Sequence, residues 1–317
     1  MRERAATDPH NQLRIRAAWL YYVEGMTQAE VAERLGVSRV MITRLISDAR
    51  RRGEVVIRIK SSLAPLIELQ HRLEERFGLE RAILAPLAGP ELDPTRAIAA
   101  VAGAYVPGII EPDTTIGVGW GRTLHMMLPY VEGRPVAGLR VVSLLGGISQ
   151  ARRFNPAEFA WQFAELFNAE GYLIPAPALV DSPQTRHALL EHCGLDQILQ
   201  MAETSNLALL SCGGIDSLTT SYRVGHVSEA ERQSLIAAGA VGDILFNFLD
   251  RNGEAVDHPV NQRSISLSLD RLKRIRKKVL ISGGRDKIDI LRSVIRAVSP
   301  TVLVTDEQTA QVILELE

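Results

Sequence analysis

Cysteine is scarce in this chain of 317 residues, which contains two, Cys193 and Cys212, far apart and in apolar surroundings. A disulfide framework or a cysteine metal site would need more thiols at closer spacing, and their absence favours a reducing cytoplasm. Long hydrophobic runs are also lacking. No stretch of about 18 uncharged apolar residues occurs, which argues against a membrane-spanning helix. The N-terminal MRERAATDPHNQ is polar and has no apolar signal region.

A large excess of one charge is missing as well, because the formal net charge is −1. The charge is unevenly distributed, however. Residues 1–60 carry 12 Lys and Arg against 7 Asp and Glu, a net of +5, which leaves −6 for residues 61–317. Positive charge attracts phosphate, so we expect nucleic-acid contacts in the N-terminal part. The length predicts about two domains. We place their boundary in the short polar segment at residues 60–65, giving domains 1–60 and 61–317.

The segment TQAEVAERLGVSRVMITRLISDARRR, residues 27–52, predicts two short helices joined by a tight turn. Thr27 and Glu30 have the spacing of a capping box, Gly36 suits a left-handed helix end, and Ser38 caps the second helix. The apolar positions form one stripe on each helix: Ala29, Val31, Ala32 and Leu35, then Ile42, Leu45, Ile46 and Ala49. This pattern predicts a helix-turn-helix, whose second helix enters the major groove of DNA.

The outward face of this predicted unit carries the candidate DNA contacts. They are Gln28, Ser38, Arg39, Met41, Thr43 and Arg44. Arginine reads guanine through two hydrogen bonds, serine and threonine meet base edges or phosphates, and Met41 suits a thymine methyl group. Gln28 is placed to hold a phosphate, which sets the register. The alternative is a generic helical hairpin with a solvated basic face, which the agreement of caps, turn and polar face disfavours.

Three neighbouring segments extend this description. Residues 13–24 predict a supporting first helix, with apolar side chains at helical spacing: Ile15, Ala18, Trp19, Tyr22 and Val23. The β-rich run at residues 55–59 predicts one strand of a small wing. After the boundary, an amphipathic helix is predicted that packs on the large domain or pairs with another subunit, through Leu66, Leu69, Leu73 and Phe77.

From residue 80 onward, short apolar strands alternate with helices. Strands are predicted at residues 82–85, 115–118, 141–145, 172–174, 207–211, 279–281 and 302–304. Helices are predicted between them at residues 94–106, 122–130, 157–168, 228–238, 286–297 and 307–314. Strands that are apolar throughout and separated by helices predict an α/β fold, a Rossmann-like and mainly parallel sheet covered on both faces.

Four predicted strands run into glycine-rich turns, and ligands bind at that end of a parallel sheet. The turns are IGVGWGRT (116–123), LLGGI (144–148), SCGGID (211–216) and SGGRDK (282–287). In the first, Gly119 and Gly121 let backbone amides approach an anion, while Arg122 adds charge and Thr123 a hydroxyl group. Each turn alone is compatible with a tight strand-to-helix connection. Four at one edge favour a site for phosphate or sugar hydroxyls.

Three charged residues complete the predicted ligand site. Lys287 follows the fourth turn, where its ammonium group reaches a bound phosphate; the alternative is that Lys287 and Arg285 are solvated surface charges. Asp243 lies between apolar residues and needs hydrogen-bond partners, either sugar hydroxyls or backbone amides of a loop. Arg263 is a candidate charge partner for the ligand or for Asp243. We recognise no metal-binding or cofactor motif.

Together these residues resemble the SorC-type (DeoR/SorC, sugar-binding) bacterial transcriptional regulators along essentially the whole chain. The motifs that carry the resemblance are AAWLYYVEGMTQAEVAERLGVSRVMITRLI, GVGWGRTL, LIPAPALVDS, GAVGDI with FLDRNG, and ISGGRDK with VTDEQTA. The resemblance implies an effector domain similar to sugar-phosphate isomerases and deaminases, but used for sensing. It also implies a tetrameric repressor or activator of a carbohydrate or polyol operon that responds to a sugar, commonly a phosphorylated one.

Carried over to this sequence, the family's effector pocket falls on Gly119, Gly121, Thr123, Asp243 and Lys287, with Arg263 as a looser match. Arg122 and His125 stand where many relatives have small or polar residues, and the loop with Arg152, Arg153 and Phe154 varies, so the effector's identity stays open. The alternative function is an active sugar-phosphate isomerase or deaminase with an appended DNA-binding domain. Its general base would be Asp243 or His226, and the sequence offers no convincing pair of catalytic groups.

Overall fold

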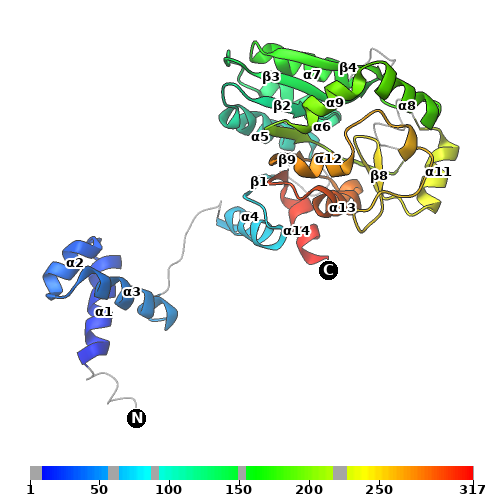
Figure 1. The fold of residues 1–317 in the computed structure, drawn as a ribbon. Helices are drawn as coiled ribbons and strands as arrows, with labels where there is room; N and C mark the ends of the chain where they lie inside the picture. The colour runs from blue at the N-terminus through cyan, green and yellow to red at the C-terminus, as the bar shows by residue number, and fades with distance from the viewer. Residues whose placement is uncertain (1–8, 56–63, 87–92, 149–154, 217–226, 317) are drawn as a thin grey trace. The chain divides into compact units, whose positions relative to one another are not determined.

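The computed structural model describes residues 9–55, 64–86, 93–148, 155–216 and 227–316 (Figure 1). Its chain forms two compact units, Met1–Ala64 and Pro65–Glu317, each with a hydrophobic core of its own. Most of the predicted wing strand, the loop with Arg152 and Arg153, and His226 lie outside the described residues. Within the described ranges, no helix combines the length and the apolar character needed to cross a membrane.

The described part of the N-terminal unit is a group of three helices: α1 (Pro9–Tyr22), α2 (Gln28–Leu35) and α3 (Arg39–Arg51). The caps predicted from the sequence are confirmed. Thr27 and Glu30 form a capping box at the start of α2. Gly36 ends α2 with a φ of 68°, a left-handed conformation that costs glycine little. Ser38 caps α3, since its hydroxyl oxygen accepts a hydrogen bond from the Met41 amide.

The core of this unit lies where α1, α2 and α3 meet. The buried side of α3 is the predicted one, formed by Ile42, Leu45, Ile46 and Ala49. In α2, Val31 and Ala32 are buried, but Ala29 is exposed, which corrects the prediction. The reason is geometric, because two residues correspond to about 200° of rotation around a helix and so place Ala29 on the far side from Val31.

The predicted inward face of α1 is wrong at three of its five positions. Three of its proposed members are exposed: Ile15 (45%), Trp19 (57%) and Val23 (60%). Ala18 is buried as predicted, and Tyr22 packs against the core. Ala17, Leu20 and the charged residue Arg14 are also buried, although they were not predicted to be. The Arg14 guanidinium donates from Nε and NH2 to the two carboxylate oxygens of Glu54, over 2.7 and 2.6 Å. This two-pronged ion pair lets an arginine occupy an inward position that periodicity assigns to apolar residues.

The large unit is built on a sheet of seven strands in the order β1-β10-β9-β5-β2-β3-β4. Neighbouring strands all run parallel, which confirms the predicted α/β fold. The strands are β1 (Arg81–Ala85), β2 (Thr115–Val118), β3 (Arg140–Gly147), β4 (Glu170–Pro177), β5 (Leu207–Leu210), β9 (Lys277–Ile281) and β10 (Val302–Asp306). All residues of β2, β5 and β10 are buried, as strands covered on both faces require.

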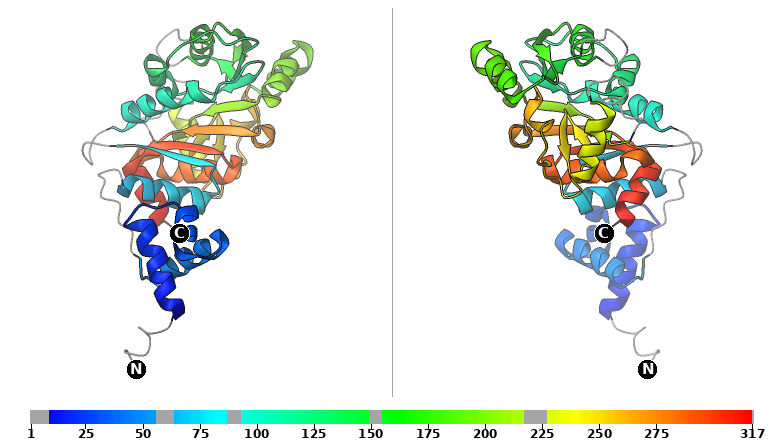
Figure 2. Two further views of the ribbon diagram at one scale, coloured as in Figure 1. Left: turned by 90° about the vertical axis from the view of Figure 1, so that its left-hand side faces the viewer. Right: turned by 90° about the vertical axis from the view of Figure 1, so that its right-hand side faces the viewer.

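Helices cover both faces of this sheet (Figures 1 and 2). One face packs against α5 (Thr95–Tyr105), α6 (Arg122–Met127) and α7 (Pro156–Leu166). The opposite face packs against α4 (Ala64–Phe77), α9 (Leu195–Glu203), α12 (Leu269–Arg274), α13 (Ile288–Val298) and α14 (Glu307–Glu315). Leu69 and Leu73 of α4 belong to the hydrophobic core on this opposite face, so this amphipathic helix packs on its own unit.

A small antiparallel sheet lies next to α13 and was not predicted from the sequence. Its strands are β6 (Gly213–Gly214), β7 (Gly242–Ile244) and β8 (Asn247–Leu249). They are two or three residues long, too short for an alternating pattern to be visible. Two further α-helices within the described ranges are α8 (Pro183–His192), which buries none of its residues and projects from the sheet in Figure 2, and α11 (Glu229–Ala237).

The ion pair of α1 gives a prediction about stability. Arg14→Ala should lower the free energy of unfolding of the N-terminal unit by about 2 kcal/mol, because Glu54 loses hydrogen bonds from a charged donor. These hydrogen bonds hold the pKa of Glu54 below its ordinary value. Their stabilisation is therefore present above the unfolded-state pKa of glutamate and is lost as the pH falls through the folded-state value.

Hydrogen–deuterium exchange of peptides from residues 9–52 in the full chain measures this effect. Arg16→Ala is the matched control, since Arg16 lies two residues away on the same helix and is exposed. We expect faster exchange in Arg14→Ala and unchanged exchange in Arg16→Ala. Equal protection in the two variants would show that the pair does not hold α1 in place.

Candidate functional site

The exposed side of α3 is polar and basic. Its exposed residues are Arg39, Val40, Thr43, Arg44, Ser47, Arg50 and Arg51. The guanidinium groups of Arg39 and Arg44 have no ion-pair or hydrogen-bond partner among the residues that the structure describes. Two cations held without carboxylates on the solvent side of this helix suit a polyanionic ligand such as the phosphate backbone of DNA.

The other candidate DNA contacts are placed less uniformly. Gln28 and Thr43 meet across the two helices, since the Thr43 hydroxyl lies 2.9 Å from Gln28 Oε1 and 3.0 Å from the Arg39 carbonyl oxygen. Ser38 uses its oxygen as the cap of α3. Met41 is partly buried and packs against the core of the unit, whereas its neighbour Val40 is exposed. The sequence interpretation chose the wrong one of these two neighbours as the outward residue.

The second candidate site lies where the chain direction across the large sheet changes. From β2 the chain continues to β3 and β4 on one side, and then returns to β5 on the other side of β2. In open parallel sheets, the crevice at the carboxyl ends of such a strand pair is the usual ligand site. The segments that follow β2 and β5, residues 119–121 and 211–212, both begin there, and β6 follows the second.

These two turns lie against each other. The Gly119 amide donates to the Leu209 carbonyl oxygen over 2.8 Å, and a Cβ added at Gly119 would lie 3.1 Å from that oxygen. Gly121 has a φ of 132°, which side chains other than hydrogen rarely tolerate, and faces Ser211. Thr123 follows in the first turn of α6 and is buried. Glycine is therefore favoured at Gly121 by its backbone conformation and at Gly119 by the close approach of the Leu209 carbonyl oxygen.

The turn after β9 joins the same cluster. The Cys212 thiol donates to Ser282 Oγ over 3.3 Å, which links the third and fourth turns. Burial raises the pKa of Cys212 to about 11, so the thiol is neutral near pH 7. The charges of Lys287, Asp243 and Asp286 all act on this thiol. Two predicted effector residues, Lys287 and Asp243, are thus brought close to the turns that follow β5 and β9.

Residues of the VTDEQTA motif hold the fourth turn in place. The Gly284 amide donates to Thr309 Oγ1 over 2.8 Å, and the Thr309 hydroxyl donates to Asp306 Oδ2 over 2.5 Å. A Cβ at Gly283 would lie 2.4 Å from the same carboxylate oxygen, so no side chain fits there. The sequence contained this motif, but Thr309 lies 25 positions after Gly284, and their pairing is visible only in the fold.

Asp243 sits in a strained hairpin. It pairs with Gly213 across the small sheet, and its Oδ2 accepts a hydrogen bond of 3.0 Å from the Phe246 amide. Leu245 and Phe246, the two turn residues between β7 and β8, have φ values of 52° and 58°. A two-residue turn with both φ positive normally carries Asn and Gly, so tertiary packing must maintain this one. The Phe246 ring stacks on Trp120 of the first turn, with centroids 5.2 Å apart.

Arg122 and Lys287 differ in their surroundings. Arg122 forms an ion pair of 2.6 Å with Asp93 and also donates to Thr95 Oγ1 over 2.7 Å. Burial alone would raise the pKa of Asp93, but hydrogen bonds from Thr95 and the charge of Arg122 lower it overall. Lys287 is half-buried, and its ammonium group has no ion-pair or hydrogen-bond partner within the described part of the chain.

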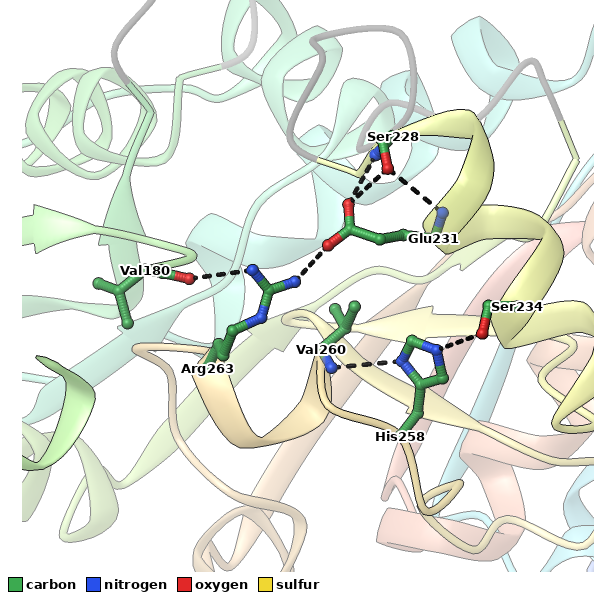
Figure 3. A network of polar contacts seen from close by, with 7 residues as sticks. All are labelled: Val180, Ser228, Glu231, Ser234, His258, Val260 and Arg263. Atoms are coloured by element: carbon green, nitrogen blue, oxygen red, sulfur yellow. Dashed lines mark hydrogen bonds and ion pairs between the residues drawn. The ribbon is translucent and has the colours of Figure 1, made fainter. Parts of the chain in front are cut away.

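Arg263 does not pair with Asp243, which was one of the two partners predicted for it. Its guanidinium pairs with Glu231 at the start of α11 and donates to the Val180 carbonyl oxygen over 3.4 Å, instead of pairing with Asp243 (Figure 3). Beside it, His258 lies 3.0 Å from Ser234 Oγ and accepts from the Val260 amide. These contacts fasten α11 to the chain segment that precedes β9. The arrangement gives Arg263 a structural contact that competes with any ligand.

The second glycine turn is also corrected. Gly146 and Gly147 are the last residues of β3 and do not form a turn after it. A Cβ at Gly146 would lie 2.5 Å from the Ala176 carbonyl oxygen of β4, so this glycine permits close strand packing. A separate open cavity of about 390 Å³ lies beside the fourth turn, lined among others by Asp216, Arg251 and Arg285, and none of the predicted effector residues lines it.

The Thr309 contacts give a prediction with an internal control. Thr309→Val removes the hydroxyl group that joins the Gly284 amide to Asp306, and should cost about 2 kcal/mol of unfolding free energy because two buried polar groups lose a partner. Thr305→Val is the matched control. Thr305 is equally buried, and its hydroxyl oxygen has no hydrogen-bond partner among the described residues. Denaturant unfolding should show a lower free energy of unfolding for Thr309→Val and little change for Thr305→Val. Equal losses in the two variants would show that the Thr309 hydroxyl does not hold the fourth turn in place.

Comparisons with known proteins agree with this geometry. Residues 61–315 match the family described as "Putative sugar-binding domain", and residues 19–52 match "Sigma-70, region 4". The chain is 31% identical to the erythritol catabolism regulatory protein EryD of Brucella abortus, covering 97% of this chain and 98% of that protein. It is 29% identical to the deoxyribonucleoside regulator of Bacillus subtilis, covering 96% and 97%.

A solved structure extends the comparison to the fold. The full-length sorbitol operon regulator SorC from Klebsiella pneumoniae superposes with a TM-score of 0.74 at 27% identity, covering 96% of this chain and 98% of that one. The match therefore includes the helix-turn-helix and the large α/β unit in one chain. This protein belongs to the sugar-binding-domain family of SorC-type, sugar-responsive transcriptional regulators.

Proposed function

We propose that this protein is a DNA-binding regulator of a carbohydrate or polyol catabolic operon, controlled by a phosphorylated sugar. Residues 1–60 would bind the operator, and residues 61–317 would bind the effector and hold the subunits of a cytoplasmic homotetramer together. Relatives named for erythritol catabolism and for the sorbitol operon support the operon class. The observation that carries the proposal is Lys287, a half-buried cation without a carboxylate partner, beside glycine turns at the sheet's switch point.

The chemistry of this edge supports a phosphorylated ligand. A cation removed from water costs free energy unless an anion compensates it, and a phosphate beside Lys287 would do so. Backbone amides of glycine-rich turns are further phosphate donors. Asp243 would accept hydrogen bonds from sugar hydroxyls. We therefore propose an effector site formed by Gly119, Gly121, Thr123, Asp243 and Lys287. Arg122 and Arg263 are left out because Asp93 and Glu231 already neutralise them.

Regulation needs two states that bind the effector differently. The effector changes operator affinity by its differential binding free energy to those states, and the coupling is reciprocal. Sensing without turnover is the simpler use of this site, because the Phe246 amide engages the Asp243 carboxylate within the hairpin. We expect no isomerisation of the bound sugar. Turnover that disappears in Asp243→Asn would instead identify an enzyme.

The first test is a thermal-shift series with sugars, polyols and their phosphates on the full chain. Ligand that binds the native state raises the unfolding midpoint. We expect a sugar phosphate to raise it, and Lys287→Ala to remove the shift because the phosphate loses its counter-charge.

Two control variants sharpen this test. Lys273→Ala removes an exposed lysine of α12, near the opposite end of β9, and should keep the shift. Arg285→Ala removes a cation from the 390 Å³ cavity and should keep it too. A shift lost in Arg285→Ala but kept in Lys287→Ala would move the site to that cavity. Stabilisation by an unphosphorylated polyol alone would refute the phosphate assignment.

The second test concerns DNA. Arg44→Ala should weaken binding to the operator by about 1–3 kcal/mol, the usual value of a two-pronged contact with guanine. Binding to a duplex of unrelated sequence should change much less, and this serves as the internal control. Titrations at one fixed salt concentration measure both affinities. An unchanged operator affinity and footprint would show that Arg44 does not reach a base.

A further inference from the structure

Val40 is the feature of the DNA-binding unit that the proposed function does not yet use. It is 71% exposed although it is an aliphatic residue in the first turn of α3. Its neighbour Met41 is partly buried against the core of the unit, so the local backbone directs one apolar side chain inward and the other outward. An exposed valine at this position gains nothing from the fold of its own chain.

The residues around Val40 identify the face on which it lies. Residues three, four and seven positions further along a helix share a face, and here they are Thr43, Arg44 and Ser47, all exposed. The buried stripe of Ile42, Leu45, Ile46 and Ala49 lies on the other side. Val40 is therefore the apolar member of the stripe that carries Arg44, at the end of the helix that enters the groove first.

Hydrogen bonds modify what Thr43 can offer to DNA. Its hydroxyl lies within bonding distance of both Gln28 Oε1 and the Arg39 carbonyl oxygen, so its proton is used inside the protein. The exposed side chain then contributes its methyl group to the stripe. Gln28 spends its carbonyl oxygen on Thr43, which leaves its amide NH₂ as the end that can donate to a phosphate. Val40 and the Thr43 methyl thus form an apolar patch beside Arg44.

We propose that this patch reads the C5-methyl group of thymine. Thymine presents the one methyl group among the four bases in the major groove, and an aliphatic side chain is its natural partner. Val40 and Arg44 are separated by about 6 Å along the helix, and bases stack about 3.4 Å apart. Each operator half-site should then contain a thymine within about two base pairs of the guanine read by Arg44. This inference rests on the proposed DNA-binding function.

The test uses an operator selected from random-sequence duplexes with the full-length protein. Each thymine is then replaced in turn by deoxyuridine, which keeps every hydrogen-bonding group and lacks the methyl. We expect the wild-type protein to lose about four-fold in affinity at one thymine per half-site, the usual effect of one buried methyl group. Val40→Ala should bind the thymine operator more weakly by a similar factor, and should no longer distinguish thymine from deoxyuridine at that position.

Met41→Leu is the matched control, because it conserves the packing of the neighbouring residue and should keep the deoxyuridine effect. Circular dichroism checks that Val40→Ala, a change at an exposed position, leaves the fold intact. If the operator affinity of the wild-type protein does not change at any deoxyuridine substitution, this assignment is overturned, while the proposed DNA-binding function stands. A Val40→Ala variant with the wild-type deoxyuridine response would overturn the assignment in the same way, and Val40 would then contact another protein surface. Absence of operator binding by the wild-type chain would overturn both this assignment and the proposed function.

Discussion

The parallel pairing of all seven strands is the constraint on which the large unit depends. Parallel neighbours are joined by crossovers, so helices cover both faces and the strands between them must be apolar throughout. Every residue of β2, β5 and β10 is accordingly buried. Few polar residues are buried along these strands, and those of β10, Thr305 and Asp306, stand at its carboxyl end. Because parallel strands end at the same edge, the turns after β2, β5 and β9 meet there without any further design.

The turns that meet at this edge are held in place by hydrogen bonds from side chains that are not among the proposed ligand contacts. Thr309 and Asp306 fix the amide of Gly284, and Ser282 ties the same turn to Cys212. Stacking of the Phe246 ring on Trp120 stabilises a hairpin turn whose positive φ values are unfavourable for Leu245 and Phe246. A backbone fixed in advance loses less entropy on binding, so such supports raise affinity without touching the ligand.

The sequence predicted what repeats along the chain and missed what depends on distant partners. The strands were identified well because a strand that is buried on both faces is apolar at every position, and its prediction does not depend on which residues face which side. The caps at Thr27, Gly36 and Ser38 are local chemistry and were correct. The predicted inward face of α1 was partly wrong, because Glu54, forty positions away, makes an inward Arg14 favourable. The small sheet was missed because strands of two or three residues carry no period. Periodicity does not identify the proposed ligand residues, which are recognised only from the convergence of the turns in the fold.

The cations illustrate why composition alone leaves function open. Arg14, Arg122 and Arg263 each face a carboxylate of their own chain, and their charge mainly serves the fold. Arg44 and Lys287 have no such partner within the described ranges. An unpaired cation on a helix face or at a sheet edge keeps its full attraction for a ligand anion, and both proposed ligands carry phosphate. Binding of two ligands to one protein is thermodynamically linked. If the effector changes the affinity of the protein for its operator by some factor, then the operator changes the affinity of the protein for the effector by the same factor. Effector affinity measured with and without operator is therefore as informative about regulation as operator affinity itself.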